Sequence, residues 1–163
     1  MKNQINTLLL FLVLVFSCKK QANQETTTIK PACDCNTITS PTKQLSLASS
    51  IIIGDWTWVY TETIGRGITK TYQTPQNTNK TITYQFTSDS LIIKENGVKT
   101  YSNKYAVGYF GDLNKTPTDT DLVVKYLTSD TITGVSLLFL DKNCMLLVNS
   151  YDDAGGNTLL KRK

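Results

Sequence analysis

The sequence predicts an all-β protein: a small eight-stranded up-and-down antiparallel barrel that follows an export signal and a flexible tether. Two observations lead to this prediction. Thr, Asn, Ser, Val, Ile and Tyr are plentiful while Ala is scarce, which favours strands over helices. Short strand-like runs also follow one another along the chain, mostly joined by tight turns, and no window has a clear helical period.

The first 17 residues have the order of a secretory signal peptide. Lys2 precedes a run of nine large apolar residues at 8–16, and Cys18 follows after one serine. A membrane-spanning helix needs about 20 apolar residues, whereas this run is short and is followed by two lysines. The segment is therefore expected to direct export and not to remain as a spanning helix.

The junction Val15-Phe16-Ser17-Cys18 resembles the lipobox of bacterial lipoproteins, with an aliphatic residue three positions before the cysteine and a small residue just before it. The resemblance implies that Cys18 is diacylated on its sulfur, becomes the first residue after cleavage, and is then N-acylated. Two or more acyl chains anchor a protein stably in a membrane. The protein is thus expected in the cell envelope, lipid-anchored to the outer membrane and facing the periplasm or the cell surface. An ordinary signal peptide with a coincidental cysteine is the alternative.

The remainder of the chain divides into a tether and one domain. Removal of residues 1–17 from the 163 leaves 146, a length typical of a single domain. Residues 18–48 are polar with few large apolar side chains, which predicts a flexible tether, and the folded domain is expected at 49–163. The processed chain has 16 basic and 13 acidic residues, a net charge of +3, and lacks a basic run interleaved with aromatics. Nucleic acid is therefore not an expected partner. The protein is expected to be a monomer.

The predicted strands are separated by recognisable turns. Asn96-Gly97 is the clearest of these, because a type I′ hairpin needs positive φ at both central residues. The strands are expected at 54–62, 81–87, 91–95, 98–107, 122–127, 131–140, 144–150 and 158–162.

Aromatic side chains alternate with smaller ones in the first of these strands, which places each alternating set on one face of the sheet. That face is expected to be the barrel interior. An interior lined by aromatic rings and hydroxyls suits a small hydrophobic or amphipathic ligand; alternatively, the rings simply fill a narrow barrel. The candidate ligand-binding residues are Trp58, Tyr60, Tyr84, Phe86, Tyr101 and Tyr105.

Gly54-Asp55-Trp56, at the head of the first predicted strand, matches the G-x-W signature of the lipocalin superfamily. Together with the loop Gly65-Arg66-Gly67 and the later hairpin, this part of the chain resembles the lipocalin-like lipoproteins of Gram-negative bacteria. The resemblance implies that Gly54 and Trp56 help to close one end of the barrel, and that Arg162, near the end of the last strand, packs across the Trp56 face. Such a contact contributes about 0.5 to 2 kcal/mol.

The loop at 63–80 corresponds to a segment that lipocalin-like barrels often use as a lid. Arg66 in this loop is therefore a candidate contact for an anionic ligand. The alternative is a solvated turn in which the flanking glycines supply unusual φ values.

Three cysteines remain once Cys18 is acylated. Cys33 and Cys35 stand one residue apart and are poorly placed for an unstrained bridge with each other. In an oxidising envelope one of them, with Cys35 favoured, is expected to bond to Cys144 and to join the end of the tether to the barrel. Three thiols without a histidine make a poor zinc site, so no metal is expected.

The chain contains no histidine, which removes the Ser-His-Asp and Cys-His routes to an activated nucleophile. The carboxylate pairs at 119 and 121 and at 152 and 153 lie in expected turns, where such residues are common. The sequence therefore favours a protein that is not an enzyme, has no cofactor, and binds a small hydrophobic or amphipathic ligand in the envelope. The alternative is a structural or interaction module whose outer surface and loops bind a protein or glycan.

Overall fold

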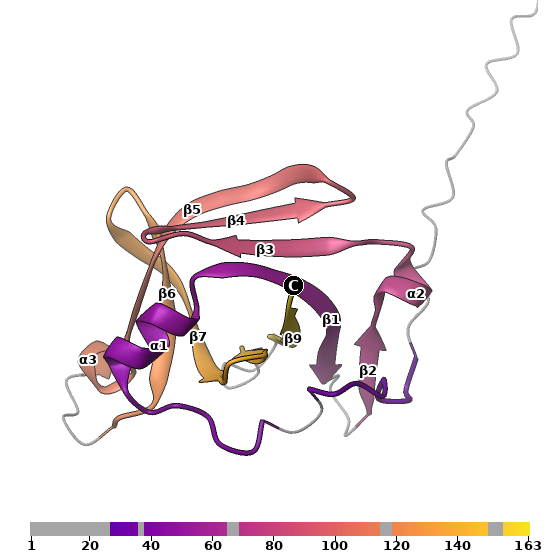
Figure 1. Cartoon of the computed structure of the whole chain (residues 1–163), viewed down its shortest axis with the longest axis horizontal. Helices are drawn as coiled ribbons and strands as arrows, with labels where there is room; N and C mark the ends of the chain where they lie inside the picture. Colours follow the sequence, from indigo (N-terminus) through magenta and orange to yellow (C-terminus); the bar gives the residue numbers. More distant parts are fainter. Residues whose placement is uncertain (1–26, 36–37, 65–68, 115–118, 150–154) are drawn as a thin grey trace, which may run out of the picture.

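A computed structural model of the chain describes residues 27–35, 38–64, 69–114, 119–149 and 155–163. Its main feature is a closed antiparallel barrel of eight strands in up-and-down order, which confirms the predicted fold class (Figure 1). Strand β1 pairs with β3 on one edge and β9 on the other, and consecutive strands from β3 to β9 pair with each other. The strands are β1 (Gly54–Ile64), β2 (Lys70–Gln73), β3 (Ile82–Phe86), β4 (Ser90–Glu95), β5 (Val98–Tyr109), β6 (Leu122–Thr128), β7 (Thr131–Leu140), β8 (Cys144–Val148) and β9 (Gly156–Arg162), and the helices are α1 (Leu45–Ile51), α2 (Pro75–Thr78) and α3 (Gly111–Asn114).

Strand β2 is an addition to the eight predicted strands. It pairs with residues 61–64 of β1, on the edge that β3 occupies at residues 54–57. This edge assignment follows because β9 takes the opposite edge of β1 from Trp56 to Thr63. The short polar sequence of β2 lies inside the segment that the sequence assigns to a loop.

Strand β5 is long and serves two parts of the barrel. Its first half pairs with β4, and its second half pairs with β6. Strands β3 and β4 therefore run across the direction of β6 and β7 in Figure 1. At the tip between β4 and β5, Asn96 and Gly97 have φ values of 50° and 82°, which is the positive pair that a type I′ turn requires.

Helix α1 was not expected from the sequence. With seven residues it is too short to be stable by propensity alone, so tertiary contacts must hold it. Ala48 and the following Ile52 are fully buried in the main core, and the helix lies beside β5 at one end of the barrel (Figure 1). The predicted all-β class is correct. Helix α1 is an unpredicted addition that covers one end of the barrel.

The segment before α1 lies against the outside of the barrel, which differs from the flexible tether predicted for this part of residues 18–48. We call its described residues, 27–35 and 38–44, the N-terminal strap. Thr27 forms an antiparallel bridge with Tyr72 of β2, Cys35 is covalently bonded to β8, and the Thr42 N–H donates to the Leu140 carbonyl at 2.9 Å. Backbone hydrogen bonds, the disulfide and ion pairs hold the strap. Because none of these contacts requires a run of apolar side chains, the polar composition of the strap did not predict them.

Candidate ligand-binding site

The end of the barrel covered by α1 is closed by Trp56 and Arg162. The indole of Trp56 is fully buried and donates to the Ile52 carbonyl at 2.8 Å. The Arg162 guanidinium lies 4.3 Å from the centre of the Trp56 ring. It also donates to three backbone carbonyls, those of Ile51, Ile53 and Lys142. These contacts connect the last strand to the α1 corner and to the turn between β7 and β8.

Gly54 is required at the start of β1 for two reasons. Its φ of 131° is one that residues with a side chain rarely adopt, and a Cβ at this position would lie 2.9 Å from the Arg162 guanidinium. The glycine of the G-x-W sequence therefore makes room for the arginine that covers the tryptophan.

Three of the candidate aromatic residues belong to the densely packed part of the interior. Trp58 is 3% exposed and its indole N–H donates to the Thr61 hydroxyl at 3.0 Å. Phe86 and Tyr105 meet edge to face with ring centres 5.0 Å apart, and the Tyr105 hydroxyl donates to the Thr87 carbonyl at 2.6 Å. Their polar groups are satisfied within the protein, so these residues contribute to stability of the core.

A cavity of about 230 Å³ lies beside this packed region and opens to solvent. It brings together two of the candidate residues, Tyr84 from β3 and Tyr101 from β5. The remaining lining residues come from the strands on both sides of the barrel: Leu91 and Ile93 of β4, Tyr126 of β6, Leu147 of β8, Asn149 after β8, and Thr158 of β9.

The hydroxyl groups of Tyr84 and Tyr101 differ from those deeper in the core. Tyr84 makes no side-chain hydrogen bond with any other residue that the structure describes, and the Tyr101 hydroxyl accepts a hydrogen bond from the Asn103 amide at 3.0 Å. Burial raises the pKa of the Tyr84 phenol to about 12. Tyr84 therefore remains protonated at neutral pH.

A chain of hydrogen bonds forms the polar wall of the cavity. The Tyr126 and Ser136 hydroxyls lie 3.0 Å apart, Ser136 donates to the Asn149 side-chain oxygen, and the Asn149 amide donates to the Gly156 carbonyl at 3.2 Å. Ser136 is fully buried. The hydrogen bonds link Tyr126 of β6 and Ser136 of β7 to Asn149, which follows β8, and to Gly156, which begins β9.

Tyr60 lies outside the barrel, which corrects the prediction that it lines the interior with Trp58. The pairing of β1 with β9 shifts between Trp58 and Tyr60, so Trp58 is opposite Leu160 whereas Tyr60 is opposite Leu159. Leu160 belongs to the main core and Leu159 to a second, outer cluster. A bulge adds one residue to one strand and so moves the following side chains to the other face.

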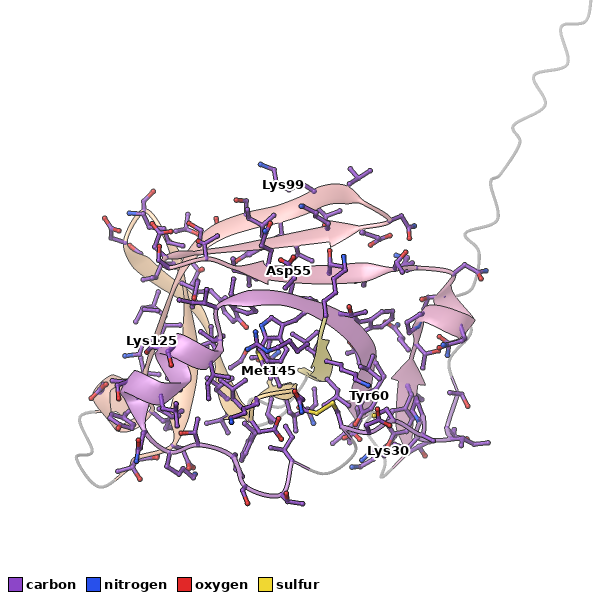
Figure 2. The ribbon with its side chains drawn as sticks, viewed as in Figure 1. Lys30, Asp55, Tyr60, Lys99, Lys125 and Met145 are labelled. Atoms are coloured by element: carbon purple, nitrogen blue, oxygen red, sulfur yellow. A yellow bond between two sulfur atoms is a disulfide. The ribbon has the colours of Figure 1, made fainter. Side chains whose placement is uncertain are left out.

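The outer cluster is formed by the strap, β2 and the outer faces of β1, β8 and β9. Tyr60 packs edge to face with Tyr72 at 5.5 Å, near the disulfide (Figure 2). Beside these rings the buried Glu62 carboxylate accepts from Lys70 at 3.1 Å and from the Tyr72 hydroxyl at 3.0 Å. Burial raises the pKa of Glu62, but the hydrogen bonds from Lys70 and Tyr72 outweigh it and bring the pKa below its usual value. The negative charge is thus part of the folded structure.

The disulfide joins Cys35 of the strap to Cys144 of β8, with their Cα atoms 5.5 Å apart. Cys33 is not in a disulfide; it is partly buried and packs against the outer cluster. Two other candidates, Cys18 and Arg66, lie outside the residues that the structure describes.

Sequence reasoning missed most of the cavity wall. Leu91, Ile93, Tyr126 and Leu147 are in predicted strands, but each has at least one apolar neighbour, so alternation did not separate inside from outside. In β6, for example, Leu122, Val123 and Val124 are all buried. Asn149 and Thr158 are polar residues of a kind expected on the outside. Each has only one apolar neighbour in the sequence, Val148 or Leu159, so no local pattern singles them out.

Family models, curated proteins and solved structures give no match to this chain. Within the described ranges, no helix has the length and apolar character needed to cross a membrane. The same residues contain no group of three or more His, Cys, Asp or Glu side chains placed to hold a metal ion.

Proposed function

We propose that this protein is a lipid-anchored binding protein that holds a small hydrophobic or amphipathic ligand inside its barrel, without catalysis. The observation that carries the proposal is the open cavity of about 230 Å³ in an otherwise packed interior. Its wall combines apolar surface with a few hydroxyl and amide groups, the usual composition of small-molecule sites.

The closed end of the barrel supports the proposed relationship to lipocalins. That resemblance implies a glycine, a tryptophan and a late arginine at one end of the barrel. Here Gly54 leaves space for Arg162, which lies over the face of Trp56. Closure at one end leaves a ligand to enter elsewhere.

The proposed anchor is Cys18, with residues 1–17 as the signal that is removed. Its support is the apolar run and the lipobox-like junction of the sequence. We place the protein at the outer membrane, facing the periplasm or the cell surface. Mass spectrometry of the membrane-extracted protein tests this: we expect a chain that begins at Cys18 and carries acyl chains. An N-terminus before residue 18, or an unmodified Cys18, would contradict the proposal.

Two observations favour the second candidate function, an interaction module that uses its outer surface. The cavity is smaller than the roughly 300 to 1,000 Å³ typical of ligand sites, and large apolar side chains are exposed on loops and strand ends. Val98 at the β4–β5 turn is 68% exposed. An exposed apolar side chain of this kind can contact a protein partner.

A matched pair of variants on the β4–β5 hairpin separates the two functions. Ile93 lines the cavity, so Ile93→Trp should fill it, whereas Val98→Ser removes an exposed apolar group and leaves the cavity unchanged. The assay is the emission of a fluorescent apolar probe added to a chain that begins at residue 18 with Cys18→Ser. We expect Ile93→Trp to abolish probe binding and Val98→Ser to retain it, with circular dichroism to verify folding. The opposite pattern would favour the interaction module.

A further inference from the structure

The cavity wall gives information on the chemistry of its ligand. The eight lining side chains are tyrosine, leucine, isoleucine, asparagine and threonine, and none of these is charged at neutral pH. A charge placed among them would lose part of its hydration without gaining a partner of opposite sign, which is unfavourable. The part of a ligand that enters this cavity should therefore be uncharged.

The hydrogen-bond donors of the wall are unequally available. Ser136 gives its proton to Asn149, so the proton shared with Ser136 comes from the Tyr126 hydroxyl. One of the two Asn149 amide protons is donated to the Gly156 carbonyl. The hydroxyl protons of this polar wall are therefore used by contacts within the protein.

Two phenol protons remain. The Tyr101 hydroxyl accepts from Asn103, which leaves its own proton free to be donated. Tyr84 makes no side-chain hydrogen bond with a described residue, and burial keeps its hydroxyl protonated. Both hydroxyls belong to side chains that line the cavity.

The size of the cavity limits the size of the ligand. At about 30 Å³ of liquid volume for each water, 230 Å³ corresponds to roughly eight waters. This is enough for a molecule with one or two small rings and too little for a long acyl chain. Leu91, Ile93 and Leu147 supply the apolar contacts for such a body.

We infer that the cavity selects an uncharged molecule of one or two rings that carries a hydrogen-bond-accepting oxygen, to which the Tyr84 and Tyr101 hydroxyls donate. This inference rests on the proposed binding function. It distinguishes the site from one for fatty acids or other anions, whose carboxylate would need a cationic partner inside the cavity.

Three probes of similar shape test the inference: acetophenone, which is neutral and has an acceptor oxygen; ethylbenzene, which lacks the oxygen; and benzoate, which is charged. Ligand-observed NMR measures their affinities for the mature protein purified from the producing cells, with the same buffer and lipid without protein as background. We expect acetophenone to bind about ten to one hundred times more tightly than ethylbenzene, as two net hydrogen bonds predict. Benzoate should bind at least ten times more weakly than acetophenone at pH 7.

The matched variants are Tyr84→Phe and Tyr101→Phe, with Tyr109→Phe as control, since Tyr109 is on β5 but does not line the cavity. Either cavity variant should lower acetophenone affinity three- to tenfold and leave ethylbenzene affinity unchanged, while the control changes neither.

Each contrary result has its own meaning. Benzoate that binds as tightly as acetophenone would overturn the uncharged-ligand inference. Equal affinities for acetophenone and ethylbenzene, unaffected by Tyr84→Phe, would overturn the hydrogen-bond assignment. If none of the three probes binds while the fluorescent apolar probe still does, the ligand class is wrong; if that probe also fails, the proposed function itself is wrong.

Discussion

The disulfide between the strap and the barrel should supply a large share of the stability of the fold. Cys35 and Cys144 are 109 residues apart in the sequence, so the bond closes a loop that includes most of the barrel. For this loop length the chain-entropy relation gives about 4.8 kcal/mol at 25 °C. Removal of the bond is therefore expected to lower the free energy of unfolding by about 3 to 5 kcal/mol, against the 5 to 15 kcal/mol typical of a whole domain.

Guanidinium denaturation followed by the fluorescence of Trp56 and Trp58 measures this loss, because both indoles are buried and become exposed on unfolding. Reduction of the native protein breaks the bond without changing any side-chain volume, and the Cys35→Ala, Cys144→Ala double variant breaks it permanently. Both should move the midpoint to lower denaturant and increase the dependence on denaturant, because the uncrosslinked unfolded chain exposes more surface.

Cys33→Ala is the matched control: this cysteine is not in a disulfide, so its substitution removes only a partly buried sulfur and should cost about 1 kcal/mol or less. The reasoning is refuted if the reduced protein unfolds at the same midpoint as the oxidised protein, or if Cys33→Ala is as destabilising as the double variant.

Three further predictions concern charged and titrating groups. Arg162→Ala should lower the free energy of unfolding by about 2 to 4 kcal/mol, because it removes the contact with Trp56 and the hydrogen bonds to three carbonyls; Arg162→Lys should recover only part of this loss in thermal denaturation. Glu62→Gln should cost about 1 to 3 kcal/mol, whereas Lys70→Met should cost less than about 1 kcal/mol because the lysine is half exposed; equal losses would show that the ion pair, and not the buried carboxylate, is what matters. Alkaline pH should unfold the protein: burial raises the pKa of three tyrosines from 10.0 to about 12, so the folded state retains these protons, and its stability is full below pH 10 and falls as the pH rises from 10 to 12. The three tyrosines are Tyr60, Tyr84 and Tyr105. Denaturation midpoints that stay constant from pH 10 to pH 12 would contradict these raised pKa values.

The barrel was predictable because its strands are separated by turns with strong local preferences. The Asn96-Gly97 hairpin is the clearest case, since the required positive φ values select these two residue types. Helix α1 and strand β2 were not predictable in the same way. Each is short, and each is held by contacts with distant residues, such as Ala48 with the barrel core and Tyr72 with Glu62.

The candidate site was predicted in part. Alternation placed Tyr84 and Tyr101 in the interior, where both line the cavity. It failed at Tyr60, because the bulge after Trp58 changes the face of the strand, and a single inserted residue has no signature in an alternating sequence. The sequence could not predict which hydroxyls of the cavity are hydrogen-bonded. Their partners, such as Asn103 for Tyr101 and Ser136 for Tyr126, are known only from the three-dimensional fold.

The N-terminal strap also sets how far the barrel can move from a membrane. With Cys18 acylated as proposed, eight residues separate the anchor from Thr27, which is already bridged to β2. Eight residues span at most about 30 Å, whereas the 30 residues from Cys18 to residue 48 would span up to about 100 Å. Under the proposed acylation, the bridge at Thr27 would therefore hold the barrel within about 30 Å of the lipid surface.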